Sequence, residues 1–128
     1  MRALLDTSTF LWFVSDSEEL SPNARQCIAD LDNPLFLSVA SLWEIAIKLS
    51  LGRLKLLQPF DQFIAQQLAQ NAITMLPIQI QHLSQLIDLP FYHRDPFDRL
   101  IIGQSISEDL AVITRDAAFS RYPIQLIW

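Results

Sequence analysis

The sequence predicts an α/β fold in which helices cover both faces of a central, mainly parallel sheet. Short apolar runs alternate with helical patterns along the chain, which is typical of strand–helix–strand units. Apolar residues make up 51% of the chain and charged residues only 18%, so a core can form and the chain is not of the disordered class. No repeat, low-complexity tract or linker interrupts the pattern, and we expect residues 1–128 to form one domain.

The strands are predicted from short apolar runs bounded by polar or turn residues. In chain order they are Ala3–Leu5, Leu35–Val39, Ile73–Leu76, Ala111–Thr114 and Ile124–Ile127. Their apolar character is continuous rather than alternating, which indicates strands buried on both faces, as in a parallel sheet.

The helices are predicted from start signals and apolar periodicity between these runs. They cover about ten residues from Pro22, then Ser41–Leu51, Pro59–Asn71, Ile80–Leu89 and Pro96–Glu108. Ser21 before Pro22 is an N-cap signature, and we expect Ala24, Ile28 and Leu31 to face the core. Gly52 can supply the left-handed conformation that ends a helix. The amphipathic helix at 59–71 presents one apolar face, made by Phe60, Phe63, Ile64 and Leu68.

Composition excludes several classes of enzyme. Gly52 and Gly103 are the only glycines, so no glycine-rich phosphate loop is present, and no G-x-S-x-G nucleophile elbow occurs. His82 and His93 are the only histidines, which is too few for a zinc site of several histidines, and neither stands at an obvious site. Cys27 is the single cysteine, so an intrachain disulfide is excluded, and we expect a structural thiol.

The compartment is predicted from the same composition. A chain without disulfides fits a reducing environment. Asp6 interrupts the apolar N-terminal stretch, which does not resemble a signal peptide, and the apolar run at 35–47 is too short to span a bilayer. We therefore expect a cytoplasmic protein without a membrane partner.

Carboxylates are the remaining candidates for chemistry, in a chain whose net charge of −5 is unlike that of a simple nucleic-acid-binding module. Asp6 and Asp116 lie just past the carboxyl ends of predicted strands, where parallel sheets bind ligands. Glu44 lies in a helix that is apolar nearly all round, and a carboxylate buried there needs a cation. Asp98 lies in the first turn of the last predicted helix, near the same sheet edge.

Each carboxylate also has a purely structural interpretation. Asp6 and Asp116 are suited to cap the helix or helical turn that follows them, and Asp95 is suited to cap the last predicted helix. Glu44 completes an S-x-x-E capping box and is placed to pair with Lys48 one turn later. Single residues therefore leave capping and metal binding open.

The joint pattern predicts a metal site. Asp6, Glu44, Asp98 and Asp116 are far apart in sequence, yet each falls where the predicted topology meets one sheet edge. Two carboxylates about 4 Å apart repel by roughly 4 kcal/mol at an effective dielectric constant of 20, so such a cluster needs cations or protonation. Hard oxygen ligands suit Mg²⁺ or Mn²⁺, and we expect one or two such ions.

Four segments make the chain resemble a known family. They are LLDTSTFLW at 4–12, SLWEIAIKLSLGRLKL at 41–56, HRDPFDRLIIGQS at 93–105 and VITRD at 112–116. In this order and spacing they resemble the PIN-domain family and, within it, the VapC-like toxins of bacterial toxin–antitoxin pairs. The likeness runs over nearly the whole chain and implies a three-layer α/β/α PIN-like domain.

The resemblance also implies an activity and its residues. It implies a metal-dependent endoribonuclease, the toxin of a type II toxin–antitoxin pair, which hydrolyses RNA phosphodiesters with Mg²⁺ or Mn²⁺ held by an acidic quartet. The four acidic residues above match that quartet by position. Ser8 and Thr114 match its supporting hydroxyl positions, and Asp95 belongs to the HRDPFDR form of its third motif.

Basic and aromatic side chains beside these motifs are candidate RNA contacts. The basic candidates for phosphate binding are Lys48, Arg94, Arg99 and Arg115. Pairing with neighbouring carboxylates is the alternative for each of them. The aromatic candidates for stacking on unpaired bases are Trp12, Phe13, Trp43, Phe91, Tyr92 and Phe97. Most of them are expected in the core, and Phe91 and Tyr92 are the best placed for exposure.

The resemblance implies two protein partners, a second copy in a homodimer and a small antitoxin whose extended segment covers the acidic site. Two other functions stay open. One is a catalytically silent PIN-like binding protein. The other is a receiver-type signalling domain, which needs an early acidic pair and a late lysine, whereas Asp6 has no acidic neighbour and the last lysine is Lys55.

Overall fold

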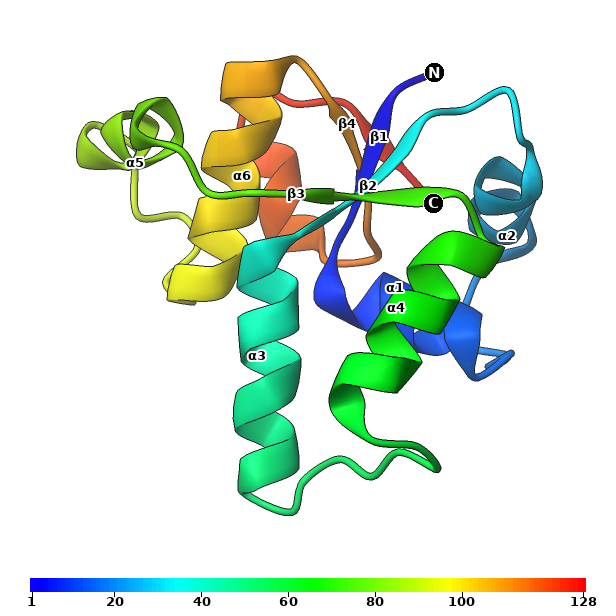
Figure 1. Cartoon of the computed structure of the whole chain (residues 1–128). Helices are drawn as coiled ribbons and strands as arrows, with labels where there is room; N and C mark the ends of the chain where they lie inside the picture. Colours follow the sequence, from blue (N-terminus) through cyan, green and yellow to red (C-terminus); the bar gives the residue numbers. More distant parts are fainter.

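A computed structural model describes the whole chain, Met1–Trp128, as a five-stranded sheet flanked by helices (Figure 1). The strands are β1 (Ala3–Leu5), β2 (Leu35–Ser38), β3 (Ile73–Leu76), β4 (Ala111–Ile113) and β5 (Leu126–Ile127). They lie in the order β3-β2-β1-β4-β5, and all neighbouring strands are parallel. The predicted α/β fold with a parallel central sheet is confirmed.

The helices between the strands follow the predicted order, with one addition. They are α1 (Thr7–Val14), α2 (Pro22–Ala29), α3 (Val39–Ser50), α4 (Phe60–Gln70), α5 (Ile80–Ile87), α6 (Pro96–Glu108) and the 3-10 helix η1 (Ala117–Arg121). The addition is α1, which the sequence indicated only as the helix that Asp6 would cap. Ser21 caps α2 as predicted, since its side chain accepts the N–H of Ala24 at 3.0 Å.

Helix α3 begins earlier than predicted. The Ser38 side chain accepts the N–H of Ala40 at 3.0 Å, so Ser38 is the N-cap. Ser41 therefore lies inside the helix, where it accepts the hydroxyl proton of Thr7 at 2.9 Å. The predicted capping box between Ser41 and Glu44 is wrong, and the Glu44 carboxylate does not cap the helix.

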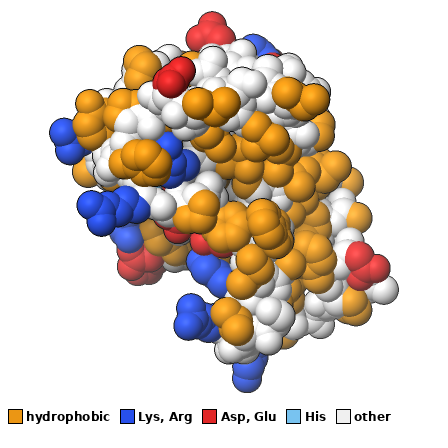
Figure 2. Space-filling model, turned by 90° about the vertical axis from the view of Figure 1, so that its left-hand side faces the viewer, with side chains coloured by type: hydrophobic (Ala, Val, Ile, Leu, Met, Phe, Trp, Pro, Cys, Tyr) orange, Lys and Arg blue, Asp and Glu red, His pale blue; other side chains and the backbone are white.

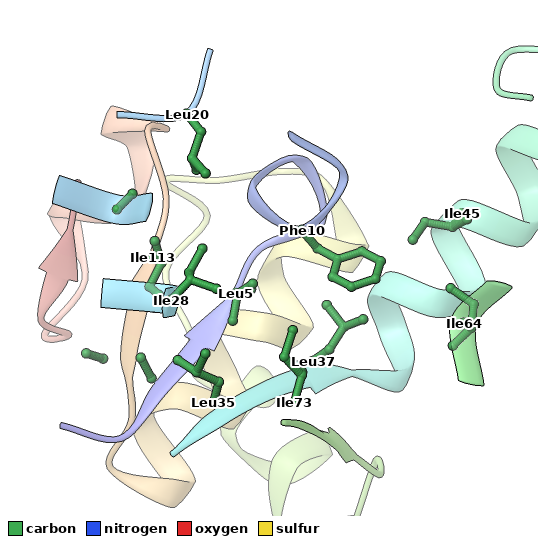
Figure 3. Close-up of a cluster of buried hydrophobic side chains, with 13 residues drawn as sticks. Leu5, Phe10, Leu20, Ile28, Leu35, Leu37, Ile45, Ile64, Ile73 and Ile113 are labelled. Carbon is green, nitrogen blue, oxygen red and sulfur yellow. The ribbon is translucent and has the colours of Figure 1, made fainter. Parts of the chain in front are cut away.

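Apolar side chains pack on both faces of the sheet. Leu5 of β1 faces the core under α1, α2 and α4, which includes Phe10 and Ile64 (Figure 3). Leu4 faces the opposite core under α6 and η1, which includes Ile101. Because both faces of the strands are buried, their sequences are continuously apolar, as predicted.

Two predictions about helix faces have different outcomes. The apolar face of α4 packs on the first core as predicted, with Ile64 buried. In α2, Ala24 and Ile28 are buried, but Leu31 is 83% exposed because the helix ends at Ala29. None of the helices is both long and apolar enough to cross a bilayer.

The sheet order creates a crevice at one edge. From β1 the chain passes to β2 on one side, and it later returns to β4 on the other side. The carboxyl ends of β1 and β4 therefore flank the point where the winding direction reverses, which is where open α/β sheets bind ligands. Asp6 and Thr114 are the residues that follow these two strands.

Candidate metal centre

Both oxygens of Asp6 are held at the end of β1. Oδ1 accepts the backbone N–H of Thr9 at 2.8 Å, which makes Asp6 the N-cap of α1. Oδ2 accepts the Thr114 hydroxyl proton at 2.5 Å. The residue is 6% exposed, and burial raises the pKa of its carboxyl despite these hydrogen bonds, which lower it. The Asp6 side chain thus caps α1 and also belongs to a polar site.

Thr114 links Asp6 to a second acidic residue. Its Oγ1 donates to Asp6 and accepts the N–H of Asp116 at 3.0 Å. The buried hydroxyl of Thr9, which the sequence did not single out, donates to the carbonyl of Ile113 at 2.8 Å. Hydroxyl groups therefore tie the start of α1 to the end of β4. Asp116 also caps η1, since its Oδ1 accepts the N–H of Ala118 at 2.9 Å.

Asp98 enters the site from the first turn of α6. Asp95 caps this helix, its Oδ1 accepting the N–H groups of Phe97 at 2.8 Å and Asp98 at 3.2 Å. The pKa of the Asp98 carboxyl is raised to about 7, mainly by burial and then by the negative charge of Asp95, with smaller contributions from Asp6 and Glu44. The acidic residues thus act on one another electrostatically.

The four predicted acidic residues line one pocket of about 320 Å³. Its lining consists of Asp6, Thr7, Ser8, Trp12, Glu44, Asp98, Arg115 and Asp116. Four carboxylates and one guanidinium leave the pocket negative. The structure therefore brings together the whole acidic quartet with Ser8, whereas Asp95 lies outside the lining and serves as a cap.

The donor set fits a hard divalent cation. The lining offers carboxylate and hydroxyl oxygens, which are the ligands that Mg²⁺ and Mn²⁺ prefer. The raised pKa values of Asp6 and Asp98 show the cost of keeping these carboxylates charged in a buried place. A bound cation would offset that cost.

His93 lies at the site, which corrects the sequence interpretation that no histidine does. Its Nε2 lies 2.9 Å from Asp116 Oδ2 and 3.1 Å from Asp98 Oδ2. One ligand atom from each of these three residues lies within 4.8 Å of the others. The only signal in the sequence was the place of His93 in the HRDPFDR segment, because the loop before α6 has no periodicity from which its course follows.

The basic residues that were predicted to contact phosphate lie in different surroundings. Lys48 pairs with Glu44 at 3.1 Å, the i,i+4 alternative. Arg115 lines the acidic pocket and pairs with Glu19 at 2.5 Å, both side chains being about half exposed. Arg94 is exposed beside the site.

Arg99 occupies a different place from the one predicted. It is 7% exposed, and its guanidinium donates to the backbone carbonyls of Leu86, Leu89, Pro90 and His93. A guanidinium with its donors committed to buried carbonyls cannot reach a phosphate, so the prediction of an RNA contact is wrong. Its i+4 position after Asp95 turns it away from the pocket and under the preceding loop.

Several of the aromatic residues considered for RNA stacking are exposed. Phe91 is 72% exposed and Tyr92 is exposed as well, as predicted. Trp43 is also exposed, contrary to the expectation of a core position, and its ring meets Phe97 edge-on with centroids 5.2 Å apart. Trp12 lines the acidic pocket.

Comparison with known proteins places this arrangement in a family. Residues 3–125 match the family described as PIN domain. The chain belongs to the PIN-domain family. No curated protein sequence matches this PIN domain.

Several solved structures share the fold of this PIN domain. VapBC2 from Rickettsia felis, bound to a promoter DNA fragment, has a TM-score of 0.74 at 16% identity, with 98% of this chain and 97% of that chain covered. FitAcB from Neisseria gonorrhoeae has a TM-score of 0.67 at 17% identity, with 97% and 95% covered. VapBC-5 from Mycobacterium tuberculosis, of the VapBC family of toxin–antitoxin systems, has a TM-score of 0.61 at 18% identity, with 98% and 96% covered.

Proposed function

We propose that this PIN domain is a cytoplasmic metal-dependent endoribonuclease, the toxin of a type II toxin–antitoxin pair. The observation that carries the proposal is the convergence of Asp6, Glu44, Asp98 and Asp116 on one pocket at the carboxyl edge of the sheet. Membership of the PIN-domain family and the fold shared with VapBC proteins support it. The same membership leaves the receiver-type alternative without support.

The catalytic roles follow from the placement of the side chains. Bound Mg²⁺ or Mn²⁺ would activate a water and offset charge on the leaving oxygen of the phosphodiester. Thr114 and Thr9 orient the Asp6 carboxylate, and Asp95 fixes the turn that presents Asp98. Arg115, on the pocket lining, can exchange Glu19 for an RNA phosphate, because exposed ion pairs are weak.

An apolar groove beside the acidic pocket supports the antitoxin as a partner. The groove measures about 650 Å³ and lies between α1, the segment before α4 and α4 itself. Leu11, Leu54 and Phe63 contribute to its lining, and Trp12 lines both the groove and the acidic pocket. A small antitoxin with an apolar segment in this groove would pass over Trp12 and cover the carboxylates.

An exposed apolar face supports the homodimer. Figure 2 shows hydrophobic side chains gathered on the side of the molecule that carries α5. On α5, Ile80 and Ile87 are 82% and 81% exposed, and Leu83 is about half exposed. Contiguous apolar surface of this kind marks a protein contact in soluble proteins. We propose that a second copy of the chain covers it.

The test of the function is RNA cleavage by the purified protein with Mg²⁺ or Mn²⁺, with EDTA, and by the Asp6→Asn and Asp6→Asn/Asp98→Asn variants. We expect metal-dependent cleavage that falls in both variants by more than the roughly 10–100-fold typical of changes beside a metal ligand. Circular dichroism should show that the variants keep the fold. Cleavage by Asp6→Asn at the parental rate would remove Asp6 from the site.

The binding-only alternative makes a separate prediction. A catalytically silent PIN-like protein would cleave no RNA and would take up no Mn²⁺ in a calorimetric titration. Metal uptake by the parental protein, lost in Asp6→Asn/Asp98→Asn, would argue against this alternative even before an RNA target is found.

A further inference from the structure

Buried polar side chains that do not line the acidic pocket hold the loop between α5 and α6. The Arg99 guanidinium donates to Pro90 O at 2.9 Å, Leu89 O at 3.0 Å and His93 O at 3.2 Å. A buried guanidinium is tolerated when its donors are satisfied, so this one holds the loop in a single course. His93 lies near the end of the loop, just before the cap of α6.

A buried tyrosine holds the same loop from the other side. Tyr122 is almost fully buried, and its hydroxyl donates to Pro90 O at 2.7 Å and accepts the N–H of His93 at 2.8 Å. The backbone of His93 is therefore bound at both its N–H, by Tyr122, and its carbonyl, by Arg99. Such preorganisation directs the side chain of His93 toward a fixed point.

The imidazole ring of His93 is held on three sides. Phe119 meets it edge-on, with centroids 5.4 Å apart and planes at 86°. Nδ1 accepts the N–H of Asp95 at 3.3 Å. A ring nitrogen that accepts a hydrogen bond bears no proton, so this contact favours the tautomer with the proton on Nε2, which lies within 3.1 Å of the carboxylates of Asp98 and Asp116.

We propose that His93 is a positioning residue of the metal centre, whose Nε2–H donates to Asp116 Oδ2 and lies close enough to Asp98 Oδ2 to hold both carboxylates in the orientation that binds the cation. The proposal rests on the metal site of the proposed function. Each carboxylate oxygen has two lone pairs, so Asp116 Oδ2 can accept this bond and still face a cation. Hydrogen bonds to metal ligands from the surrounding shell set ligand orientation and affinity in this way.

The alternative, direct ligation by His93, conflicts with the hydrogen bonds around the ring. A neutral imidazole that offers the Nε2 lone pair to a cation carries its proton on Nδ1. That proton would face the N–H of Asp95, which is held in the cap of α6. The geometry therefore favours a donor at Nε2.

The test compares Mn²⁺ affinity in His93→Ala and His93→Gln by calorimetry. A glutamine side-chain N–H can take the place of Nε2–H, whereas alanine offers no donor. We expect a 10–100-fold loss of affinity in His93→Ala and recovery of most of it in His93→Gln. Unchanged affinity in His93→Ala would overturn the proposal, and an equal loss in both variants would overturn it in favour of direct ligation.

A second measurement locates the proton on the His93 ring. Long-range ¹H–¹⁵N spectra of the full chain should show the His93 proton on Nε2 both without metal and with saturating Mg²⁺. Transfer of that proton to Nδ1 on Mg²⁺ binding would show that Nε2 is a ligand and would overturn the proposal.

Two controls separate this proposal from the proposed function. His82→Ala removes the other histidine–carboxylate contact, to Glu108 at the far end of α6, and should leave Mn²⁺ affinity unchanged. Asp98→Asn should weaken Mn²⁺ binding whatever the role of His93. A parental protein that takes up no Mn²⁺, or an Asp98→Asn variant that binds normally, would refute the metal site and the positioning role with it.

Discussion

At the scale of single residues, the Thr114 hydroxyl gives its one proton to Asp6 while accepting the N–H of Asp116. Thr114→Val keeps the branched shape but removes both bonds, so we expect the free energy of unfolding to fall by about 1–3 kcal/mol. The same change removes a hydrogen bond that lowers the pKa of Asp6, so protons compete better with metal. Mn²⁺ affinity should therefore fall more at pH 6 than at pH 8.

Thr114→Ser is the matched control for that prediction. Serine restores the hydroxyl, and we expect it to recover both the stability measured by urea denaturation and the pH dependence of Mn²⁺ affinity. An equal loss of affinity at both pH values in Thr114→Val would show that the hydroxyl does not act on Asp6.

The raised pKa of Asp98 predicts how pH acts on the metal-free protein. The pKa of this carboxyl has its ordinary value of 3.8 in the unfolded chain and is about 7 in the folded protein. Between these values the folded state binds more protons, so this group makes stability fall as pH rises, until the loss is complete above about pH 7. Urea denaturation in EDTA should give a lower free energy of unfolding at pH 8 than at pH 5.

Asp98→Asn should flatten this pH dependence. Without metal at pH 8, we expect the variant to be more stable than the parent by about 1 kcal/mol, a common gain when a functional charge is removed. It should bind Mn²⁺ weakly. A slope between pH 5 and pH 8 that is the same in parent and variant would show that another group controls it.

The residues of the site were predictable to different degrees. Asp6 and Asp116 follow strand ends and Asp98 follows a helix start, so local pattern was enough to bring them to one edge. His93 was missed because its direction depends on Arg99 and Tyr122, which hold the loop through contacts that no local pattern encodes. Arg99 was misplaced because a basic residue between acidic ones gave no sign that it is buried.

At the scale of elements, the clearest local signals gave the most accurate bounds. Helix α6 has the bounds predicted, since Asp95 caps it, Pro96 starts it and Asp109 ends it with a left-handed φ of 54°. Helix α1 was weakly indicated because apolar residues are consecutive from Phe10 to Val14, a pattern that fits a buried strand as well as a helix.

Gly103 sets the approach of α5 to α6. A Cβ at this position would lie 2.9 Å from Leu86 Cδ2 and 3.1 Å from the His82 carbonyl oxygen. To make room for this Cβ, the Leu86 side chain can rotate, but the backbone of α5 at His82 has to move. We expect Gly103→Ala to lower the free energy of unfolding by about 1–3 kcal/mol, although alanine favours helix. Urea denaturation checks this, with Ser107→Ala on the same helix as a control of helix propensity alone. A more stable Gly103→Ala would contradict the tight packing.

At the scale of the whole molecule, the acidic pocket and the apolar face of α5 belong to different surfaces. Leu83→Glu/Ile87→Glu places charges on the apolar face, and we expect a dimer of the parent to become a monomer with an unchanged circular dichroism spectrum. Light scattering after size exclusion measures the mass. Leu57→Glu, at a fully exposed leucine that is not on α5, is the control and should stay dimeric. A parent that is monomeric at high concentration would contradict the homodimer.

Strand β1 occupies the middle of the sheet, yet its neighbour β4 is translated much later, and Thr114 is separated from Asp6 by 108 positions. Until β4 has left the ribosome, β1 has one bare edge, and Asp6 lacks its hydroxyl donor. A nascent chain that stops short of Asp116 thus carries only part of the pocket. The acidic pocket on which the proposed function depends is therefore completed only near the end of synthesis.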